Sequence, residues 1–206
     1  MGCAFGAVRS LLILGVTAVA IVALFHDSIT HAVAGDPLLR EAHVLAPAPV
    51  LHFAPDENLE RLDEQQLRRA RSRIDISMYS FTDRKLTAVL AELAARGVVV
   101  RLYRDQEQFR HEQLFSRGRG LSTTAMLRQI PNIHIRVKGG SPRNLMHQKD
   151  YCLDGKRLRD GSANWSPGSE KRQDNSLWFS SDPRQVAAYE RKFDEMWNRA
   201  SNLVVQ

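Results

Sequence analysis

The sequence predicts an α/β domain whose mixed, largely parallel β-sheet is flanked by helices. Three features predict this fold. Strand-like and helix-like apolar periods alternate over residues 50–138, an Asp-Gly pair separates two strand-like segments, and an amphipathic helix ends the pattern. The 206 residues are 43% hydrophobic and 25% charged, which suits one folded domain with an appendage and excludes a wholly disordered chain. We therefore expect a single folded domain over residues 50–206.

The first 34 residues have the pattern of an export signal or a membrane anchor. An uncharged apolar run from Ser10 to Phe25 follows Arg9. A signal core needs about 7 to 15 apolar residues and a spanning helix about 20, so the run falls between the two. The small residues Ala32–Ala34 offer a cleavage site, and residues 35–49 have the composition of a linker. Residues 1–34 are therefore expected to be a cleaved signal peptide or a retained anchor, in a protein that is exported, periplasmic or membrane-anchored outside the cytoplasm.

The first half of the domain alternates strands with helices. Asp83 offers a helix cap, apolar residues follow it at helical spacing, and Gly97 closes that helix. This order predicts parallel strands joined by a right-handed crossover. The expected strands are Val50–Ala54, Arg73–Phe81 and Val98–Tyr103, and the expected helices occupy 58–73 and 83–97.

Residues 104–121 carry four arginines and two phenylalanines without a strong period, which predicts a basic loop. The loop is either a solvated connection or one wall of a groove for a polyanion, where guanidinium groups meet phosphates and aromatic rings stack on bases. A short helix over 123–129 and a strand over 133–138 are expected to follow.

The second half is expected to return to the sheet through a hairpin. Strand 146–153 ends at Asp154-Gly155, a pair that favours a tight turn, and the paired strand runs to about Asn164. A further strand covers 175–180. Asp182-Pro183 then begins a last helix, whose apolar face is formed by Val186, Tyr189, Phe193 and Trp197.

Four polar residues on the two hairpin strands have the spacing of a phosphate site. His147 and Lys149 are two apart, as are Ser162 and Asn164, so each pair is expected on one face of its strand. An imidazole can attack phosphorus, an ammonium group can hold the anionic oxygens, and a hydroxyl and an amide add neutral donors. The pattern therefore predicts a cradle for a phosphodiester.

The spacing also carries a family resemblance. The pattern H-x-K-x4-D-x6-G-S-x2-N, which resembles the signature of the phospholipase D superfamily, is matched at His147, Lys149, Asp154, Gly161, Ser162 and Asn164. The single motif and the flanking segments RIDISMYSFTD, RGVVVRLYRD and RQDNSLWF are similar to the group of Nuc-type endonucleases and mitochondrial cardiolipin hydrolases, over residues 48–200. The resemblance implies a phospholipase D-like fold and a metal-independent phosphodiesterase that forms a phosphohistidine and needs no cofactor.

The implied mechanism needs two histidines, one to attack phosphorus and one to protonate the leaving oxygen. None of the histidines other than His147 is followed by lysine two residues later, so the chain holds one copy of the motif. The resemblance therefore implies a homodimer with a shared active site, in which His147 of each subunit takes one role.

Two carboxylates are candidates to support the site. Asp174 is expected to orient the His147 ring, although the relatives carry a longer glutamate there. Asp154 either takes part in the reaction or fixes the hairpin turn. No metal is expected, because no dense group of Asp and Glu stands beside the motif in the sequence. Cys152, Trp165 and Trp178 are expected in the core.

Three functions fit these residues. The first is a non-specific endonuclease on DNA or RNA, which the net charge of +6 favours because it attracts nucleic acid. The second is a phospholipase D acting on phospholipid headgroups, which an N-terminal anchor favours. The third is a noncatalytic polyanion-binding protein that keeps the fold.

Overall fold

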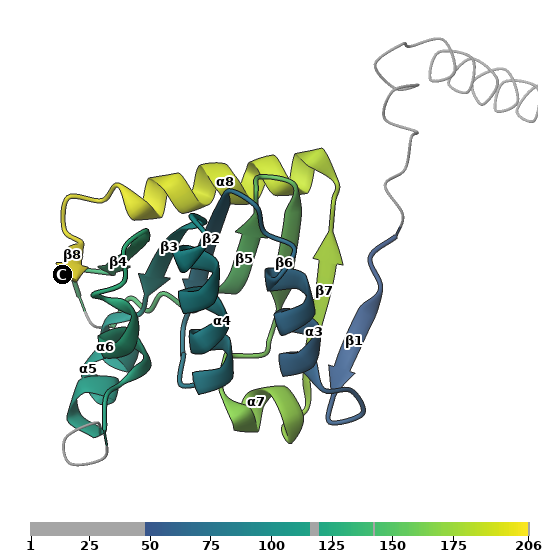
Figure 1. Ribbon diagram of the computed structural model, residues 1–206, viewed down its shortest axis with the longest axis horizontal. Helices are drawn as coiled ribbons and strands as arrows, with labels where there is room; N and C mark the ends of the chain where they lie inside the picture. The colour runs from purple at the N-terminus through teal and green to yellow at the C-terminus, as the bar shows by residue number, and fades with distance from the viewer. Residues whose placement is uncertain (1–47, 116–119, 142, 206) are drawn as a thin grey trace, which may run out of the picture. The chain divides into compact units, whose positions relative to one another are not determined.

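The strand with the strongest apolar alternation, Arg73–Met78, lies at the centre of the sheet and is buried on both faces. The computed structural model describes residues 48–115, 120–141 and 143–205, and their strands form one sheet of eight strands (Figure 1). The expectations for residues 1–34 and for most of the linker lie outside these ranges. Within the described part of the chain, no helix combines the length and the apolar character needed to cross a bilayer.

The elements follow the chain in a regular alternation up to β4 and then in a meander (Figure 1). The strand order across the sheet is β1-β7-β6-β5-β2-β3-β4-β8. The strands are β1 (Leu51–Ala54), β2 (Arg73–Met78), β3 (Val99–Arg104), β4 (Ile133–Val137), β5 (Lys149–Leu153), β6 (Arg157–Gly161), β7 (Asn175–Ser180) and β8 (Leu203–Val205). The helices are α3 (Leu59–Leu67), α4 (Arg84–Ala95), α5 (Gln106–Phe115), α6 (Thr123–Leu127), α7 (Pro167–Lys171) and α8 (Pro183–Trp197).

The sheet is mixed, as predicted, but the expectation that it is largely parallel is wrong. Among the described residues only β2–β3 and β3–β4 are parallel pairs. The other pairings, β1–β7, β2–β5, β4–β8, β5–β6 and β6–β7, are antiparallel. The reason is the return of the chain after β4, because β5 enters beside β2 in the opposite direction and β6 and β7 follow as a meander.

Residues 104–121 are not the continuous loop that the sequence predicted, because α5 occupies Gln106–Phe115. The buried Asp105 carboxylate begins this helix, since it accepts hydrogen bonds from the backbone nitrogens of Glu107 (2.9 Å) and Gln108 (3.1 Å). Arg104 lines no groove: it is 1% exposed and pairs with Glu112 at 3.2 Å. The helix escaped detection because polar residues anchor it, so its apolar period is weak. Helix α7 and strand β8 were also not predicted from the sequence.

Two apolar layers enclose the sheet. Leucines of α3 and α4 pack on one face with Ile74 and Ile76, and this cluster also contains Trp165, which is fully buried as predicted. The other face is covered by α8, whose Tyr189 and Phe193 pack with Cys152 and Leu158. Figure 1 shows α8 crossing the sheet on the side away from α3 and α4. Cys152 is a buried free thiol, which agrees with its expected place in the core.

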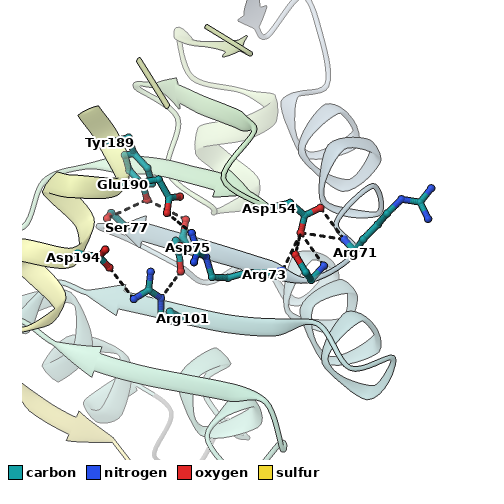
Figure 2. Close-up of polar contacts among 10 residues, drawn as sticks. Arg71, Arg73, Asp75, Ser77, Arg101, Asp154, Tyr189, Glu190 and Asp194 are labelled. Carbon is teal, nitrogen blue, oxygen red and sulfur yellow. Dashed lines mark hydrogen bonds and ion pairs between the residues drawn. The ribbon is translucent and has the colours of Figure 1, made fainter. Parts of the chain in front are cut away.

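The Asp154-Gly155 turn joins β5 to β6, and its aspartate has a structural role. Both turn residues have positive φ, 54° and 64°. The Asp154 carboxylate points at the backbone before β2 and accepts hydrogen bonds from the nitrogens of Arg71 (3.0 Å), Ser72 (2.8 Å) and Arg73 (2.9 Å) (Figure 2). Partial burial opposes ionisation, but these hydrogen bonds outweigh it and hold the pKa of Asp154 below its ordinary value.

We predict that Asp154→Asn lowers the free energy of unfolding at pH 7 by about 1 to 3 kcal/mol, because an amide cannot accept all of these backbone hydrogens. Asparagine tolerates the left-handed backbone, so the turn itself is kept. Urea denaturation of both proteins measures the difference.

The comparison of wild type with Asp154→Asn also predicts a pH dependence. The folded pKa of Asp154 is lowered, so its stabilisation is present above the ordinary value of 3.8 and is lost as the pH falls below that value. The difference between wild type and Asp154→Asn should therefore shrink in acid. Asp56→Asn, in an exposed turn, is the matched control. A difference that is independent of pH would contradict this role.

Candidate active site

His147 and Lys149 meet at the start of β5, as their spacing predicted. The Lys149 Nζ lies 3.2 Å from the His147 Nδ1 and donates to the His147 backbone oxygen at 2.6 Å. The strand begins at Lys149 rather than Met146, so His147 lies just outside the sheet. Its side chain is exposed, whereas Lys149 is 6% exposed. The imidazole ring therefore faces solvent beside an ammonium group that the protein encloses.

The end of β2 supplies the next layer of the site. Tyr79 follows β2, and its backbone nitrogen donates to the Gln148 oxygen at 2.9 Å. The Tyr79 and His147 rings lie 4.6 Å apart between centroids, and the Lys149 Nζ lies 4.9 Å from the centre of the Tyr79 ring. Tyr79 therefore restricts the imidazole and offers its ring face to the cation. Gln108 of α5 donates to the tyrosine hydroxyl at 3.2 Å.

Asp105 ties the histidine segment to the neighbouring strand. It follows β3, is 1% exposed, and its Oδ2 accepts a hydrogen bond from the Met146 nitrogen at 2.9 Å. The other carboxylate oxygen begins α5, so one side chain positions both α5 and the residue before His147. No sequence pattern singled out Asp105, because its two roles join segments that lie 41 residues apart.

Asn164 lies on the other side of the β2 end. Its Oδ1 accepts a hydrogen bond from the Ser80 nitrogen at 3.1 Å, and its own backbone nitrogen donates to the Ser169 hydroxyl at 2.9 Å. Among the residues the structure describes, the Asn164 Nδ2 donates to no protein group. The Tyr79–Ser80 segment thus lies between the His147 segment and the Asn164 segment and contacts both. The Asn164 Nδ2 remains available as a donor.

Ser162 is placed differently from the expected free phosphate donor. Its hydroxyl donates to the Asn175 Oδ1 at 2.8 Å and accepts from the Ser176 nitrogen at 3.0 Å. Asn175 also donates to Ser169, which in turn accepts from the Asn164 nitrogen. Asn175 therefore helps to position both Ser162 and Asn164. The preceding Gly161 has no room for a side chain, since a Cβ there would lie 2.2 Å from the Ser176 oxygen. Asn175 is a site residue that the sequence reading missed.

A fully buried arginine joins the two halves of the motif from behind. Arg159 of β6 donates to the Lys149 backbone oxygen and, at 3.1 Å, to the Ala163 backbone oxygen. Its guanidinium pairs with Asp63 of α3 at 3.1 Å, and both side chains are 0% exposed. Asp63 also accepts from the Trp165 ring nitrogen at 2.9 Å. The segment with Lys149 and the segment with Asn164 therefore share one buried anchor.

Burial and neighbouring charges shift the pKa of Lys149 in opposite directions. Burial lowers the pKa of Lys149 from its ordinary value, and Arg159 lowers it further, while Asp150 and Asp105 act in the other direction. The enclosed ammonium group is thus less costly to deprotonate than an exposed lysine. A bound phosphate anion would restore its preference for the charged form.

The two remaining predicted residues do not join this cluster. Asp154 lies beyond the far end of β5, a strand of five residues that spans about 16 Å. Its carboxylate faces the backbone before β2 (Figure 2). This contact supports a structural role for Asp154 in fixing the hairpin turn, and it does not support a role in the reaction. Asp174 is exposed and lines an open depression with Ser162, Asn175 and Ser176. Within the chain it makes no described contact with His147, whose ring partner is Lys149.

One group of carboxylates outside the motif has the arrangement of a possible metal site. Glu60, Asp83 and Glu170 are buried, and a carboxylate oxygen of each lies within 4.8 Å of the others. They come from three separate segments, so no cluster is visible in the sequence. None of them contacts His147 or Lys149 in the described part of the chain.

The arrangement suits chemistry at a phosphodiester. An exposed imidazole can reach phosphorus, an adjacent ammonium group can neutralise a nonbridging oxygen, and a free amide can donate to another. These groups are held by buried side chains, so little reorganisation is needed when an anion binds.

Comparison with known proteins agrees with this geometry. Residues 64–197 match the family described as "Cardiolipin synthase, PLD-like domain", and the chain belongs to this family. The resemblance to the phospholipase D superfamily and its α/β fold is thereby confirmed. The structure is similar to NucT from Helicobacter pylori, with a TM-score of 0.66 and 24% identity over 76% of this chain and 98% of that one.

The matches to curated relatives cover only part of those proteins. A mitochondrial cardiolipin hydrolase of Chlamydomonas reinhardtii is 26% identical over 125 residues, which are 61% of this chain and 51% of the relative. A phospholipase D of Rickettsia bellii is 25% identical over 137 residues, 66% of this chain and 63% of the relative. The match thus spans about half to three fifths of the curated relatives' length.

We predict that Asn164→Asp separates the two roles of Asn164. Aspartate can still accept from Ser80, so the free energy of unfolding should change by less than about 1 kcal/mol. It removes the amide donor and adds negative charge beside the phosphate, so turnover should fall by roughly 10² to 10³. Asn164→Ala should lose both stability and turnover. Equal turnover of Asn164→Asp and wild type would show that the amide does not act on substrate.

Proposed function

We propose that this chain is a phosphodiesterase in which His147 takes the phosphoryl group onto nitrogen. The observation that supports it most is the exposed His147 ring beside the enclosed Lys149 ammonium group, with the free Asn164 amide across the Tyr79–Ser80 segment. The family membership of residues 64–197 agrees with this chemistry.

The reaction has two displacements. A ring nitrogen of His147 attacks phosphorus, the P–O bond to the leaving group breaks, and a second imidazole gives that oxygen a proton. Water then attacks phosphorus, returns a proton to the second imidazole, and breaks the P–N bond to free His147. Lys149 and the Asn164 amide hold the nonbridging oxygens while charge builds on them.

The second imidazole is proposed to be His147 of another copy of the chain. In the sequence, His147 is the one histidine that is followed by lysine two residues later, so each chain supplies one copy of the motif. A twofold axis beside the exposed His147 would bring two identical rings to one phosphate, one as nucleophile and one as acid. The homodimer therefore completes a site that each chain supplies by half.

Nucleic acid is the proposed substrate class. The donors of the site address only a phosphodiester, so they would accept any sequence, and the chain carries a net charge of +6. The exposed His147 side chain lies where β2 ends and β5 begins, and an exposed position of this kind can receive a long polymer.

Phospholipid is the second candidate, and exposed leucines favour it. Leu145, two residues before His147, is 45% exposed, and Leu121 is 65% exposed. The Leu121 oxygen accepts from Arg84 at the start of α4, and Thr123 donates to the Phe81 oxygen, which places this segment near the end of β2. Apolar side chains beside a phosphate site can enter a lipid surface. The curated relatives named above agree with this alternative.

The substrate test uses pure full-length protein with single-stranded DNA, duplex DNA, RNA, phosphatidylcholine vesicles and cardiolipin vesicles, all in excess chelator and below the unfolding temperature. Cleavage of the nucleic acids supports the nuclease. Cleavage confined to the vesicles supports the lipid alternative, and Leu121→Ser with Leu145→Ser should then lower lipid turnover. Leu203→Ser, on the far edge strand β8, is the matched control. Binding of nucleic acid without cleavage of any substrate would support the noncatalytic reading.

We predict that an alkaline quench during turnover traps the cleaved phosphoryl fragment on His147, because the N–P bond survives base better than acid. Peptide mass spectrometry locates the adduct. His147→Ala should give no adduct and lose roughly 10³-fold or more in turnover, since no other group can form the intermediate. His134→Ala, an exposed strand histidine, should behave as wild type. Full turnover without any adduct would exclude the covalent mechanism.

We predict that inactive His147→Ala chains poison wild-type chains when subunits exchange. If each site needs two His147 rings, equal mixing should lower the activity per wild-type chain to about half, because half of those chains enter one-ring dimers. His134→Ala chains, mixed in the same way, should cause no loss. Activity that stays proportional to wild-type protein, or an active monomer in light scattering, would contradict the shared site.

A further inference from the structure

Three buried carboxylates gather behind the site, at the starts of three helices. Glu60 lies in the first turn of α3, Asp83 caps α4, and Glu170 lies in α7. Their exposed fractions are 5%, 1% and 0%, and one oxygen of each lies within 4.8 Å of the others. Like charges at this separation repel strongly in a low-dielectric interior, so the cluster needs a counterion or a proton.

Nearby protein cations do not fully supply that charge. Lys171 pairs with Glu60, and Lys85 lies 3.5 Å from the same carboxylate. Asp83 uses one oxygen to accept from the Leu86 nitrogen at 2.8 Å. Lys85 pairs more closely with Glu64, at 2.6 Å, and neither Asp83 nor Glu170 forms an ion pair among the described residues.

Glu170 is the member without a partner. Both of its carboxylate oxygens are buried and make no hydrogen bond to any described group. A buried polar group of this kind costs free energy unless a ligand satisfies it. Burial, with Asp63 and Asp83 nearby, raises the pKa of Glu170 to about 10. The orphaned carboxylate points into the cluster, and this is the second observation that indicates a ligand.

We propose that Glu60, Asp83 and Glu170 bind a hard divalent cation of the calcium class. The donors are all carboxylate oxygens, and the cluster has no His or Cys that would favour a softer metal. Calcium takes six to eight oxygen ligands at about 2.3 to 2.6 Å in flexible geometry, and three carboxylates from separate helices can supply part of such a shell. Magnesium requires a near-regular octahedron and gives up its water ligands reluctantly, so a buried site made of protein carboxylates should bind it more weakly.

The proposed ion would stabilise the site without touching the phosphate. The Thr82 and Asp83 nitrogens donate to the Trp165 oxygen at 2.8 and 3.0 Å, and Trp165 follows Asn164 directly. Glu170 follows Ser169, whose hydroxyl accepts from the Asn164 nitrogen. A cation held by three helix starts would therefore fasten the segment that presents Asn164. Its binding does not depend on whether the chain is a phosphodiesterase.

The test measures the ion itself. Full-length protein is stripped with chelator, dialysed, and heated with added calcium or magnesium. At a calcium concentration about 100-fold above the dissociation constant, the unfolding midpoint should rise by about 5 to 10 °C, with a smaller rise for magnesium at the same concentration. Terbium replaces calcium at oxygen sites, and Trp165 lies close enough to excite it. Tryptophan-sensitised terbium emission that calcium displaces would support the site directly.

Glu170→Gln is the decisive variant, because its neutral amide keeps the size of the side chain and removes the negative charge that a divalent cation would need there. It should fold, show no calcium-dependent rise and give no displaceable terbium emission. Glu195→Gln, exposed on α8, is the matched control and should respond as wild type. A wild-type midpoint that calcium leaves unchanged, together with no displaceable emission, would show that the cluster binds no such cation. Turnover of Glu170→Gln is measured in excess chelator as well. If turnover is retained, the result on the ion and the result on the proposed reaction can be judged separately.

Discussion

The geometry of the site depends on one buried guanidinium group. Arg159 donates to the backbone oxygens of Lys149 and Ala163, and thus holds together the two chain segments that carry the residues of the motif. Burying this charge is costly, and Asp63 offsets the cost as an ion pair that also accepts from Trp165. Only arginine has enough donors in a fixed plane to satisfy two carbonyls and a carboxylate at once. The protein keeps this charge in its interior because it fixes positions.

Sheet topology explains why the candidate site residues gather at one end of the strands. Strand β5 runs antiparallel to β2, so the residues before β5 meet the residues after β2. Strand β6 runs antiparallel to β5, which brings its carboxyl end, with Ser162 and Asn164, to the same edge. Asp105 arrives there because β3 is parallel to β2. A layer of buried or half-buried polar groups therefore surrounds an exposed imidazole, and the site is rigid although its histidine lies outside regular structure.

Residues of one signature serve unrelated physical purposes. Lys149 and Asn164 face the site, Gly161 allows β6 to approach β7, and Asp154 fastens the opposite end of β5 to the start of β2. The signature thus describes a folded strand pair as much as a reaction. The acidic group of Glu60, Asp83 and Glu170 belongs to no signature, yet it adjoins the segment that carries Asn164.

The sequence alone determined the features that depend on short-range chemistry. It predicted the Asp-Gly turn, the cap and apolar face of α8, the buried Cys152 and Trp165, the contact between His147 and Lys149, and the family. Periodicity and local spacing encode such features directly. Only the tertiary structure decided the strand order, the antiparallel return, the helix within residues 104–121, and the partners Asp105, Arg159 and Asn175. These depend on contacts between polar groups far apart in the chain, and no local pattern shows which buried donor will meet which acceptor.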